Sequence, residues 1–269
     1  MFAILIIIVD LIATVLGVYL FDYRIDGVVN DLFIIILCIL AGILIATLFV
    51  VIVLETFYYI LPKKSWEKSM IAHKIVKQIV SVPIHFSNMT IKIVGKENLP
   101  KEHGFSIYVN HTSWIDIPII MYKLTNQPVA ALGKVDAFKI PMIGKFAPKL
   151  GCVMIDRSDA RQGAKAIKHV VTNIKNGFSM IIFPEGTRNP NPSTVLDFKH
   201  GAFKAALRSE KPLVPMTIVK PKNFKEIKWP FRKRITLVIH PPLQYSEFEK
   251  MKTSELSSIV KKAIGNPLG

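Results

Sequence analysis

The sequence has few cysteines and lacks the common motifs of nucleotide-binding proteins and serine hydrolases. Only Cys38 and Cys152 occur among 269 residues, which argues against a disulfide scaffold and against a cysteine-rich zinc site. No G-x-G-x-x-G or Walker pattern is present, so nucleotide binding has no local support. A G-x-S-x-G elbow is also absent from the sequence, so nothing indicates a serine nucleophile.

Acidic residues are scarce, and the charge is unevenly distributed along the chain. There are 19 acidic residues against 35 Lys and Arg, a formal net charge of +16. Because 51% of the residues are hydrophobic, the chain is not a disordered basic tail. Residues 1–61 contain one basic and five acidic residues, so the remainder holds a net charge of +20. The chain therefore divides into an apolar part and a basic part.

The apolar part, residues 1–61, predicts two transmembrane helices. Phe33–Leu54 is an uncharged apolar run, and about 20 such residues are enough to cross a bilayer as a helix. Phe2–Phe21 is a second candidate, interrupted by Asp10. A signal peptide is the alternative for this segment, but it has neither a basic n-region nor a small-residue cleavage site. We expect a transmembrane helical hairpin at the N-terminus.

The charges that flank these segments predict their orientation. The connection FDYRIDGVVND has one Arg and three Asp, whereas Lys63, Lys64 and Lys68 follow the second segment. The positive-inside rule therefore places the N-terminus and the basic domain on the cytoplasmic face, at the cell membrane if the source is bacterial. Residues 62–89 are amphipathic with helical spacing. An interfacial helix and an ordinary packed helix both remain open for this segment.

Residues 90–269 predict an α/β domain with a central, mainly parallel or mixed sheet flanked by helices. Short apolar runs bounded by Gly, Pro, Asn or charge alternate with helical stretches, as is typical of such folds. The expected strands are TIKIV, FSIYV, CVMI, SMIIF, LVPMTIV and RITLVI. The expected helices are Trp114–Lys123, Met142–Lys149, Ala160–Lys175 and Ala202–Ser209.

Two strand ends deliver polar side chains. FSIYV is followed by His111, which suits proton transfer near neutral pH, and a carboxylate at Asp116 could fix its tautomer. The alternative is that Ser113-x-x-Asp116 is only a helix-capping box. SMIIF is followed by a glycine, a hydroxyl and an arginine, which could bind a phosphate, or could form a solvated turn. Loops at strand ends are where α/β sheets bind ligands, so two such loops favour a site.

These loops resemble the sequence blocks of the glycerolipid acyltransferases. Asn110–Asp116 matches N-H-x-x-x-x-D, and Phe183–Arg188 matches F-P-E-G-T-R. Two further blocks are similar, one comprising Gly133, Lys134, Val135, Asp136, Pro141, Gly144, Gly151 and Arg157, the other Val214, Pro215 and Met216. The blocks span residues 110–216 in the family's order and are most similar to the 1-acyl-sn-glycerol-3-phosphate acyltransferase group. Asp136, Ala137 and Asn189 depart from the usual Glu, Leu and Ser.

The resemblance implies a reaction and a set of site residues. His111 would be the general base for the sn-2 hydroxyl of lysophosphatidic acid, and Asp116 would orient it. The acyl donor would be acyl-coenzyme A (acyl-CoA) or acyl carrier protein (acyl-ACP), as cosubstrate, with no cofactor and no metal. The residues implied to hold the acceptor or its phosphate are Glu185, Gly186, Thr187, Arg188, Arg157, Lys199 and Lys134.

Two other functions remain open from the sequence. One is a related acyltransferase that uses a different lysophospholipid acceptor in phospholipid remodelling. The other is a non-catalytic basic module that tethers membrane lipid or nucleic acid, which the positive charge would support. The tether does not require a His and an Asp beside one strand end and E-G-T-R at another. We therefore expect membrane lipid as a partner and no nucleic acid.

Overall fold

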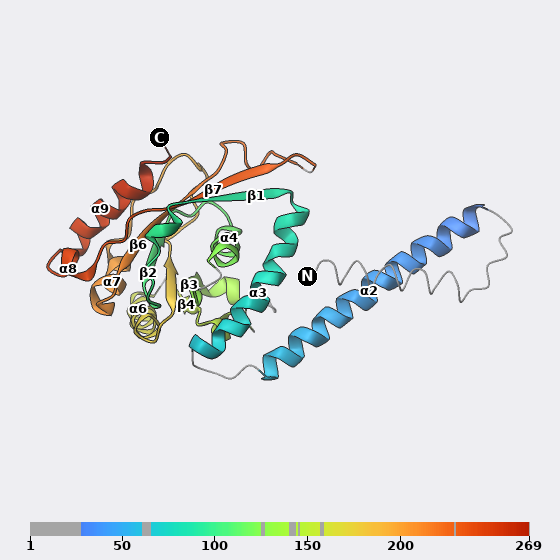
Figure 1. Cartoon of the computed structure of the whole chain (residues 1–269), viewed down its shortest axis with the longest axis horizontal. Helices are drawn as coiled ribbons and strands as arrows, with labels where there is room; N and C mark the ends of the chain where they lie inside the picture. The colour runs from blue at the N-terminus through green and yellow to red at the C-terminus, as the bar shows by residue number, and fades with distance from the viewer. Residues whose placement is uncertain are drawn as a thin grey trace. The chain divides into compact units, whose positions relative to one another are not determined.

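The fold is described from a computed structural model of the chain, shown in Figure 1. The structure describes residues 28–60, 66–124, 127–139, 144, 146–156, 159–228 and 230–268. The chain divides into two compact units, Met1–Pro62 and Lys63–Gly269. Each unit is described by itself.

The first unit contains one long apolar helix, α2 (Val28–Ile60). Its stretch Ile36–Val53 is long and apolar enough to cross a membrane. Thr47 Oγ1 donates to the carbonyl of Ile43 over 2.7 Å, so its hydroxyl is satisfied inside the apolar helix. The helix predicted at Phe33–Leu54 is confirmed, and it extends further, from Val28 to Ile60. The other predicted span, Phe2–Phe21, lies outside the described residues, so the hairpin stays a prediction.

The second unit is built on a seven-stranded mixed sheet in the order β1-β7-β6-β2-β5-β3-β4. All neighbouring pairs are parallel except β6 and β7, so β1 and β7 run against the other five strands. The strands are β1 (Met89–Val94), β2 (Ser106–Val109), β3 (Val129–Lys134), β4 (Val153–Ile155), β5 (Ser179–Ile182), β6 (Leu213–Val219) and β7 (Lys233–Ile239). The predicted central sheet, mainly parallel, is confirmed.

Helices cover both faces of this sheet, as Figure 1 shows. In β2, Ile107 and Val109 face the core beneath α3 and α4, whereas Tyr108 faces the core beneath α6, α7 and α9. This alternation buries both faces of the central strands. The α-helices are α3 (Trp66–Phe86), α4 (Asp116–Lys123), α6 (Ala160–Lys175), α7 (Lys204–Ser209), α8 (Tyr245–Phe248) and α9 (Thr253–Gly265). The 3₁₀ helices are η1 (Lys96–Asn98), η2 (Val135–Lys139), η3 (Ala147–Leu150) and η4 (His200–Phe203).

Most of the predicted elements are confirmed, with three omissions among the strands and α-helices. The six expected strands are present, and α6 has the expected bounds because Asp159 caps it, accepting from the N–H of Arg161 over 2.8 Å. Strand β3 and helices α8 and α9 were not predicted. The helix expected at Met142–Lys149 is only partly described, and Ala147–Leu150 there forms a 3₁₀ helix.

The amphipathic segment forms α3, which packs against α4, η3 and β1. Ala72 and Ile84 are buried, and His73 Nε2 lies 2.6 Å from the carbonyl oxygen of Val129. The helix is therefore a packed part of the α/β unit. That α3 also lies at a membrane interface stays a prediction.

The direction of the strands determines where loops meet. Strands β2, β3, β4, β5 and β6 are parallel and end at one edge of the sheet, which we call the site edge. Because β7 is antiparallel to β6, it begins at this same edge. The residues that follow the strands here are His111 after β2, Lys134 at the end of β3, Glu185 after β5 and Lys220 after β6.

Candidate active site

The loop between β2 and α4 brings His111 and Asp116 into contact. His111 Nδ1 lies 2.9 Å from Asp116 Oδ2, and the carboxylate is fully buried. The same oxygen accepts the backbone N–H groups of Thr112 and Ser113 over 2.8 and 2.9 Å. The predicted contact of His111 with Asp116 is therefore present. Ser113-x-x-Asp116 is not a complete capping box, because the residue that caps α4 is Ile115 and no side chain caps this helix.

Asp116 is held as a carboxylate by its surroundings. Burial alone would raise its pKa, but the hydrogen bond with His111 and the positive charge of Lys220 lower the pKa below its ordinary value. Lys220 pairs with Oδ1 of Asp116, and its side chain is also buried. An ionised Asp116 accepts from Nδ1–H, so the proton of a neutral His111 sits on Nδ1 and Nε2 is the free base.

The His111 ring has the surroundings expected of a general base. It stacks on Phe183, with ring centroids 3.9 Å apart and planes at 20°. Its side chain is 12% exposed, so it reaches the surface only at one side. Within the described part of the chain, no hydrogen-bond partner occupies Nε2. A hydroxyl group placed against Nε2 could give up its proton.

Glu185 connects the loop after β5 to the histidine loop. Its Oε1 accepts the backbone N–H of His111 over 2.8 Å, and its Oε2 accepts the N–H of Leu196 over 2.9 Å. The residue is buried, which raises the pKa of its carboxyl group, and the two N–H groups oppose this shift. Both oxygens are used inside the protein. A contact of Glu185 with the acceptor stays a prediction.

The next residues of this loop, Gly186, Thr187 and Arg188, are more accessible. Gly186 has φ of +73°, a left-handed conformation that favours glycine, and the space beside it is bounded by the stem of Lys199. Lys199 is held by its backbone N–H, which donates to the carbonyl of Pro184 over 2.7 Å. Thr187, Arg188 and the Lys199 side chain are exposed and available for an anion.

An open pocket of about 220 Å³ lies beside the two loops. It is lined by Thr112, Ser113, Trp114, Arg188, Asn189, Pro190 and Lys225. Trp114 is 68% exposed, and Arg188 and Lys225 supply positive charge. Asn189 fixes the wall of the pocket, because its backbone N–H donates to the carbonyl of His111 over 2.7 Å. The pocket thus pairs positive charge with an exposed indole next to the histidine loop.

The structure does not bring all the predicted phosphate ligands into contact with the histidine. Lys134 lies at the site edge, exposed, and pairs with Asp136 over 2.5 Å. Two lysines surround that aspartate, Lys134 and Lys139, and they lower its pKa to about 2. Arg157 lies outside the described residues. The phosphate-binding roles of Lys134 and Arg157 stay predictions.

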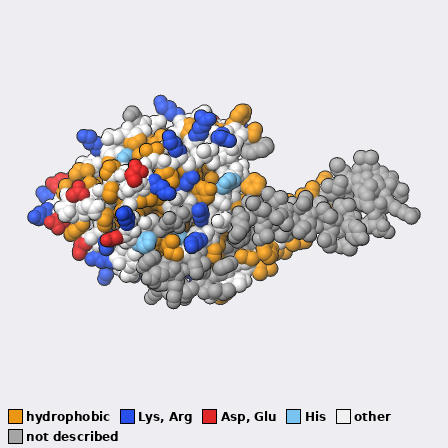
Figure 2. Space-filling model, in the orientation of Figure 1, with side chains coloured by type: hydrophobic (Ala, Val, Ile, Leu, Met, Phe, Trp, Pro, Cys, Tyr) orange, Lys and Arg blue, Asp and Glu red, His pale blue; other side chains and the backbone are white. Residues whose placement is uncertain are grey.

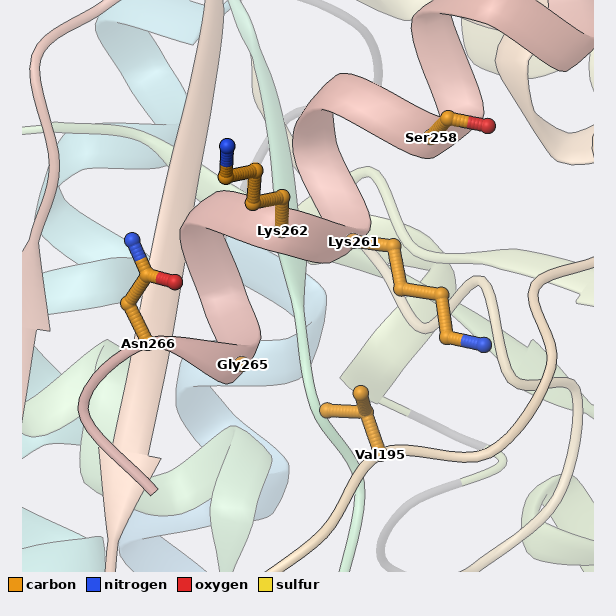
Figure 3. A pocket seen from close by; sticks show the side chains of 6 residues that line it. All are labelled: Val195, Ser258, Lys261, Lys262, Gly265 and Asn266. Carbon is orange, nitrogen blue, oxygen red and sulfur yellow. The ribbon is translucent and has the colours of Figure 1, made fainter. Parts of the chain in front are cut away.

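A larger hollow of about 520 Å³ lies elsewhere, between α9 and Val195 (Figure 3). Its walls carry Lys261 and Lys262, and Lys261 Nζ pairs with Asp197 over 2.7 Å. None of its lining residues belongs to the His111–Asp116 pair. In the ranges that the structure describes, no group of three His, Cys, Asp or Glu side chains could hold a metal ion.

Two buried polar residues complete the site and were not identified as functional from the sequence. Asn110 donates to the carbonyl of Ile218 over 3.1 Å and accepts its N–H over 2.8 Å, which joins the ends of β2 and β6. Lys220 follows β6 and reaches Asp116. In the sequence, Lys220 resembles the exposed lysines that follow it, so no local pattern distinguishes it.

Comparison with known proteins places these loops in a family. The sequence model of the Acyltransferase family matches residues 90–219, which contain both loops. The 1-acyl-sn-glycerol-3-phosphate acyltransferase of Bacillus subtilis is 30% identical over 175 residues, covering 65% of this chain and 84% of that protein. The protein of the same name from Borreliella burgdorferi is 27% identical over 192 residues, covering 71% of this chain and 76% of that protein.

The fold is also similar to a solved structure. The crystal structure of the 1-acyl-sn-glycerophosphate (LPA) acyltransferase PlsC from Thermotoga maritima matches with a TM-score of 0.66. The match covers 82% of this chain and 87% of that chain, at 24% sequence identity. It supports the mixed α/β architecture with helices on both faces.

Proposed function

The chain belongs to the 1-acyl-sn-glycerol-3-phosphate acyltransferase family, and we propose that it transfers a fatty acyl group to the sn-2 hydroxyl of lysophosphatidic acid, giving phosphatidic acid for phospholipid synthesis. The observation that carries this proposal is the 2.9 Å contact of His111 Nδ1 with the buried carboxylate of Asp116, which leaves Nε2 free at the site edge. The relatives from two bacteria carry the name of this activity.

The reaction needs one base and no covalent enzyme intermediate. Nε2 of His111 takes the proton of the sn-2 hydroxyl while Asp116 accepts from Nδ1–H and stabilises the imidazolium. The hydroxyl oxygen forms a bond to the thioester carbonyl carbon, and the C–S bond then breaks. The imidazolium returns its proton to the leaving thiolate, so the products are phosphatidic acid and a free thiol.

The phosphate of the acceptor is proposed to bind beside this base. Arg188 is exposed at the pocket that adjoins Thr112 and Ser113, and a guanidinium suits bidentate phosphate binding. Thr187 lies next to Arg188 in the loop after β5, and Lys199 lies further along the same segment, before η4. Lys134, at the end of β3, would contribute further positive charge to the same edge. Arg157 is a further proposed ligand of the phosphate. The acyl donor is acyl-CoA or acyl-ACP, with no cofactor.

The chain has features that suit a membrane surface. Helix α2 carries the apolar stretch Ile36–Val53, which we propose spans the membrane with the α/β unit on the cytoplasmic face. Figure 2 shows Lys and Arg side chains spread over the α/β unit, with hydrophobic side chains between them. Phe231 is 71% exposed beside Arg232, in the segment that joins β6 to β7 at the site edge. The exposed ring of Phe231 and the neighbouring charge of Arg232 would contact anionic lipid.

The proposal is tested by thiol release from the full chain, purified in detergent. Acyl-CoA is supplied with and without lysophosphatidic acid, and acyl-ACP and lysophospholipids with larger headgroups are compared in parallel. Release that depends on lysophosphatidic acid supports the proposal. A preference for another lysophospholipid would indicate a remodelling enzyme, and release without any acceptor would indicate a hydrolase. No release with any pair of substrates would indicate a lipid tether.

A further inference from the structure

Lys220 is a buried cation in contact with the carboxylate that orients His111. It follows β6, and its side chain is 1% exposed. Its ammonium group pairs with Oδ1 of Asp116, whose other oxygen contacts His111. The backbone next to Lys220 is fixed as well, because Ile218 exchanges two hydrogen bonds with the Asn110 side chain. The end of β6 and the histidine loop are therefore joined at two points.

The contacts of this ammonium group use its whole donor capacity. It donates to Thr112 Oγ1 over 2.8 Å, to Ser113 Oγ over 2.9 Å and to Asp116 Oδ1. An ammonium group has three N–H donors, and all three acceptors belong to the histidine loop. The Phe224 ring, with its centroid 5.1 Å from Nζ, covers another side. No donor is left for a substrate phosphate, so Lys220 differs from the exposed cations Arg188 and Lys199.

A buried lysine is costly unless its charge is compensated. Burial lowers the pKa of Lys220, and the charge of Asp116 opposes that shift. In the described part of the chain, the other titratable groups near the pair are His111 and Glu185 beside Asp116 and Lys225 beside Lys220. Removing either partner of this buried pair would be strongly destabilising, because the other charge would stay buried and unpaired.

The geometry points to Lys220 as a positioning residue for the acyl transfer. By holding Thr112, Ser113 and Asp116 at once, it fixes the turn between His111 and Asp116, and it thereby sets the direction of Nε2. It does not touch substrate. This inference rests on the proposed function, and it predicts that Lys220 acts on kcat and leaves the binding of acceptor and donor unchanged.

The test compares Lys220→Met and Lys220→Arg with Lys222→Met in the full chain. Lys222 is an exposed lysine two residues further on and serves as the matched control. Lys220→Met removes the cation and should lower kcat roughly 100-fold, since small misplacements of a catalytic group cost about this much. The KM values for lysophosphatidic acid and the acyl donor should stay within about twofold of wild type. Lys222→Met should behave as wild type.

Lys220→Arg decides the question if Lys220→Met does not fold. The planar guanidinium keeps the charge but cannot donate to the same three acceptors, so we expect kcat to fall roughly tenfold with KM unchanged. For either variant, a kcat close to wild type would overturn the inference. So would a raised KM for lysophosphatidic acid with kcat unchanged, because Lys220 would then be a substrate ligand.

A second readout does not depend on turnover. In protein labelled with ¹⁵N-histidine, the Nδ1–H resonance of His111 is assigned by its loss in His111→Gln. We expect it to move or to disappear through exchange in Lys220→Met and Lys220→Arg, and to be unchanged in Lys222→Met. An unchanged resonance in both Lys220 variants would overturn the inference. If wild type transfers no acyl group, the proposed function fails, while this measurement still tests the positioning of His111.

Discussion

The backbone N–H of His111 donates to Oε1 of Glu185 over 2.8 Å, so the loop after β5 supports the histidine that follows β2. Glu185 binds Leu196 with its other oxygen, and β2 and β5 are neighbouring parallel strands. The carboxylate therefore links three segments of the chain. The F-P-E-G-T-R loop thus supports His111, the proposed general base, and is also a candidate phosphate site.

Glu185→Gln should weaken this link. A glutamine offers one acceptor oxygen and places an NH₂ group against a second N–H donor, which costs about 1–3 kcal/mol when both are buried. We expect a lower free energy of unfolding and a kcat reduced roughly 10- to 100-fold, because the backbone of His111 shifts. Glu249→Gln, at an exposed carboxylate, is the control. Chemical denaturation and steady-state kinetics check both effects, and unchanged kinetics would show that the link is dispensable.

Two glycines provide a matched pair of substitutions. Gly186→Ala places a side chain on a residue with φ of +73°, where L-residues cost about 1–2 kcal/mol. Its Cβ would lie 3.4 Å from Cγ of Lys199, so the effect comes from the backbone. Gly163→Ala, inside α6 with nothing within 4 Å, should instead stabilise by about 0.5–1 kcal/mol. Thermal unfolding should show opposite signs, and equal shifts would contradict the loop geometry.

Acid should remove the stabilisation that Asp116 provides. Its pKa is lowered from 3.8 in the folded state, so its contribution is complete above that value and is lost as the pH falls through the lower folded pKa. We expect the free energy of unfolding of wild type to fall more steeply than that of Asp116→Asn from about pH 5 to about pH 2. Denaturant titrations across this range measure the difference. Parallel curves for the two proteins would contradict the ionised, paired state of Asp116.

Phe231 and Arg232 should affect access to lipid and leave the chemistry intact. Phe231→Ser and Arg232→Ser remove an exposed aromatic ring and an exposed cation, and each is worth about 1–3 kcal/mol at an anionic membrane surface. In micelles containing anionic lipid, we expect the apparent KM for lysophosphatidic acid to rise at unchanged kcat. Ile259→Ser, at an exposed position of α9, is the control. A KM equal to that of wild type would place the membrane contact elsewhere.

The sequence was sufficient to predict those parts of the fold that are specified locally. Short apolar runs predicted strands such as β5, and the helical stretch Ala160–Lys175 predicted α6. Strand β3 was missed because VAALGK contains two alanines and a glycine, which are poor strand formers, and its pairing with β4 and β5 decides its conformation. Helix α9 carried a visible signal in the four-residue spacing of Leu256, Val260 and Ile264.

The candidate site was predictable only as far as its motifs extend. His111, Asp116 and Glu185 lie in recognisable blocks, and the structure brings them together. Lys220 was not predictable, because its contact with Asp116 joins residues 104 positions apart and depends on β6 lying beside β2. The same long-range dependence applies to the Asn110–Ile218 link. Local patterns identify chemical groups, whereas the strand order determines which groups meet.

The central claim is that His111 takes the proton of the sn-2 hydroxyl of lysophosphatidic acid. The most direct measurement supplies the full chain with lysophosphatidic acid and a ¹³C-labelled acyl thioester and quantifies labelled phosphatidic acid by mass spectrometry, for wild type and His111→Gln. We predict labelled phosphatidic acid from wild type, and a rate at least about 100-fold lower from His111→Gln, as expected for loss of a general base. Equal rates from the two proteins, or label found only in free fatty acid, would contradict it.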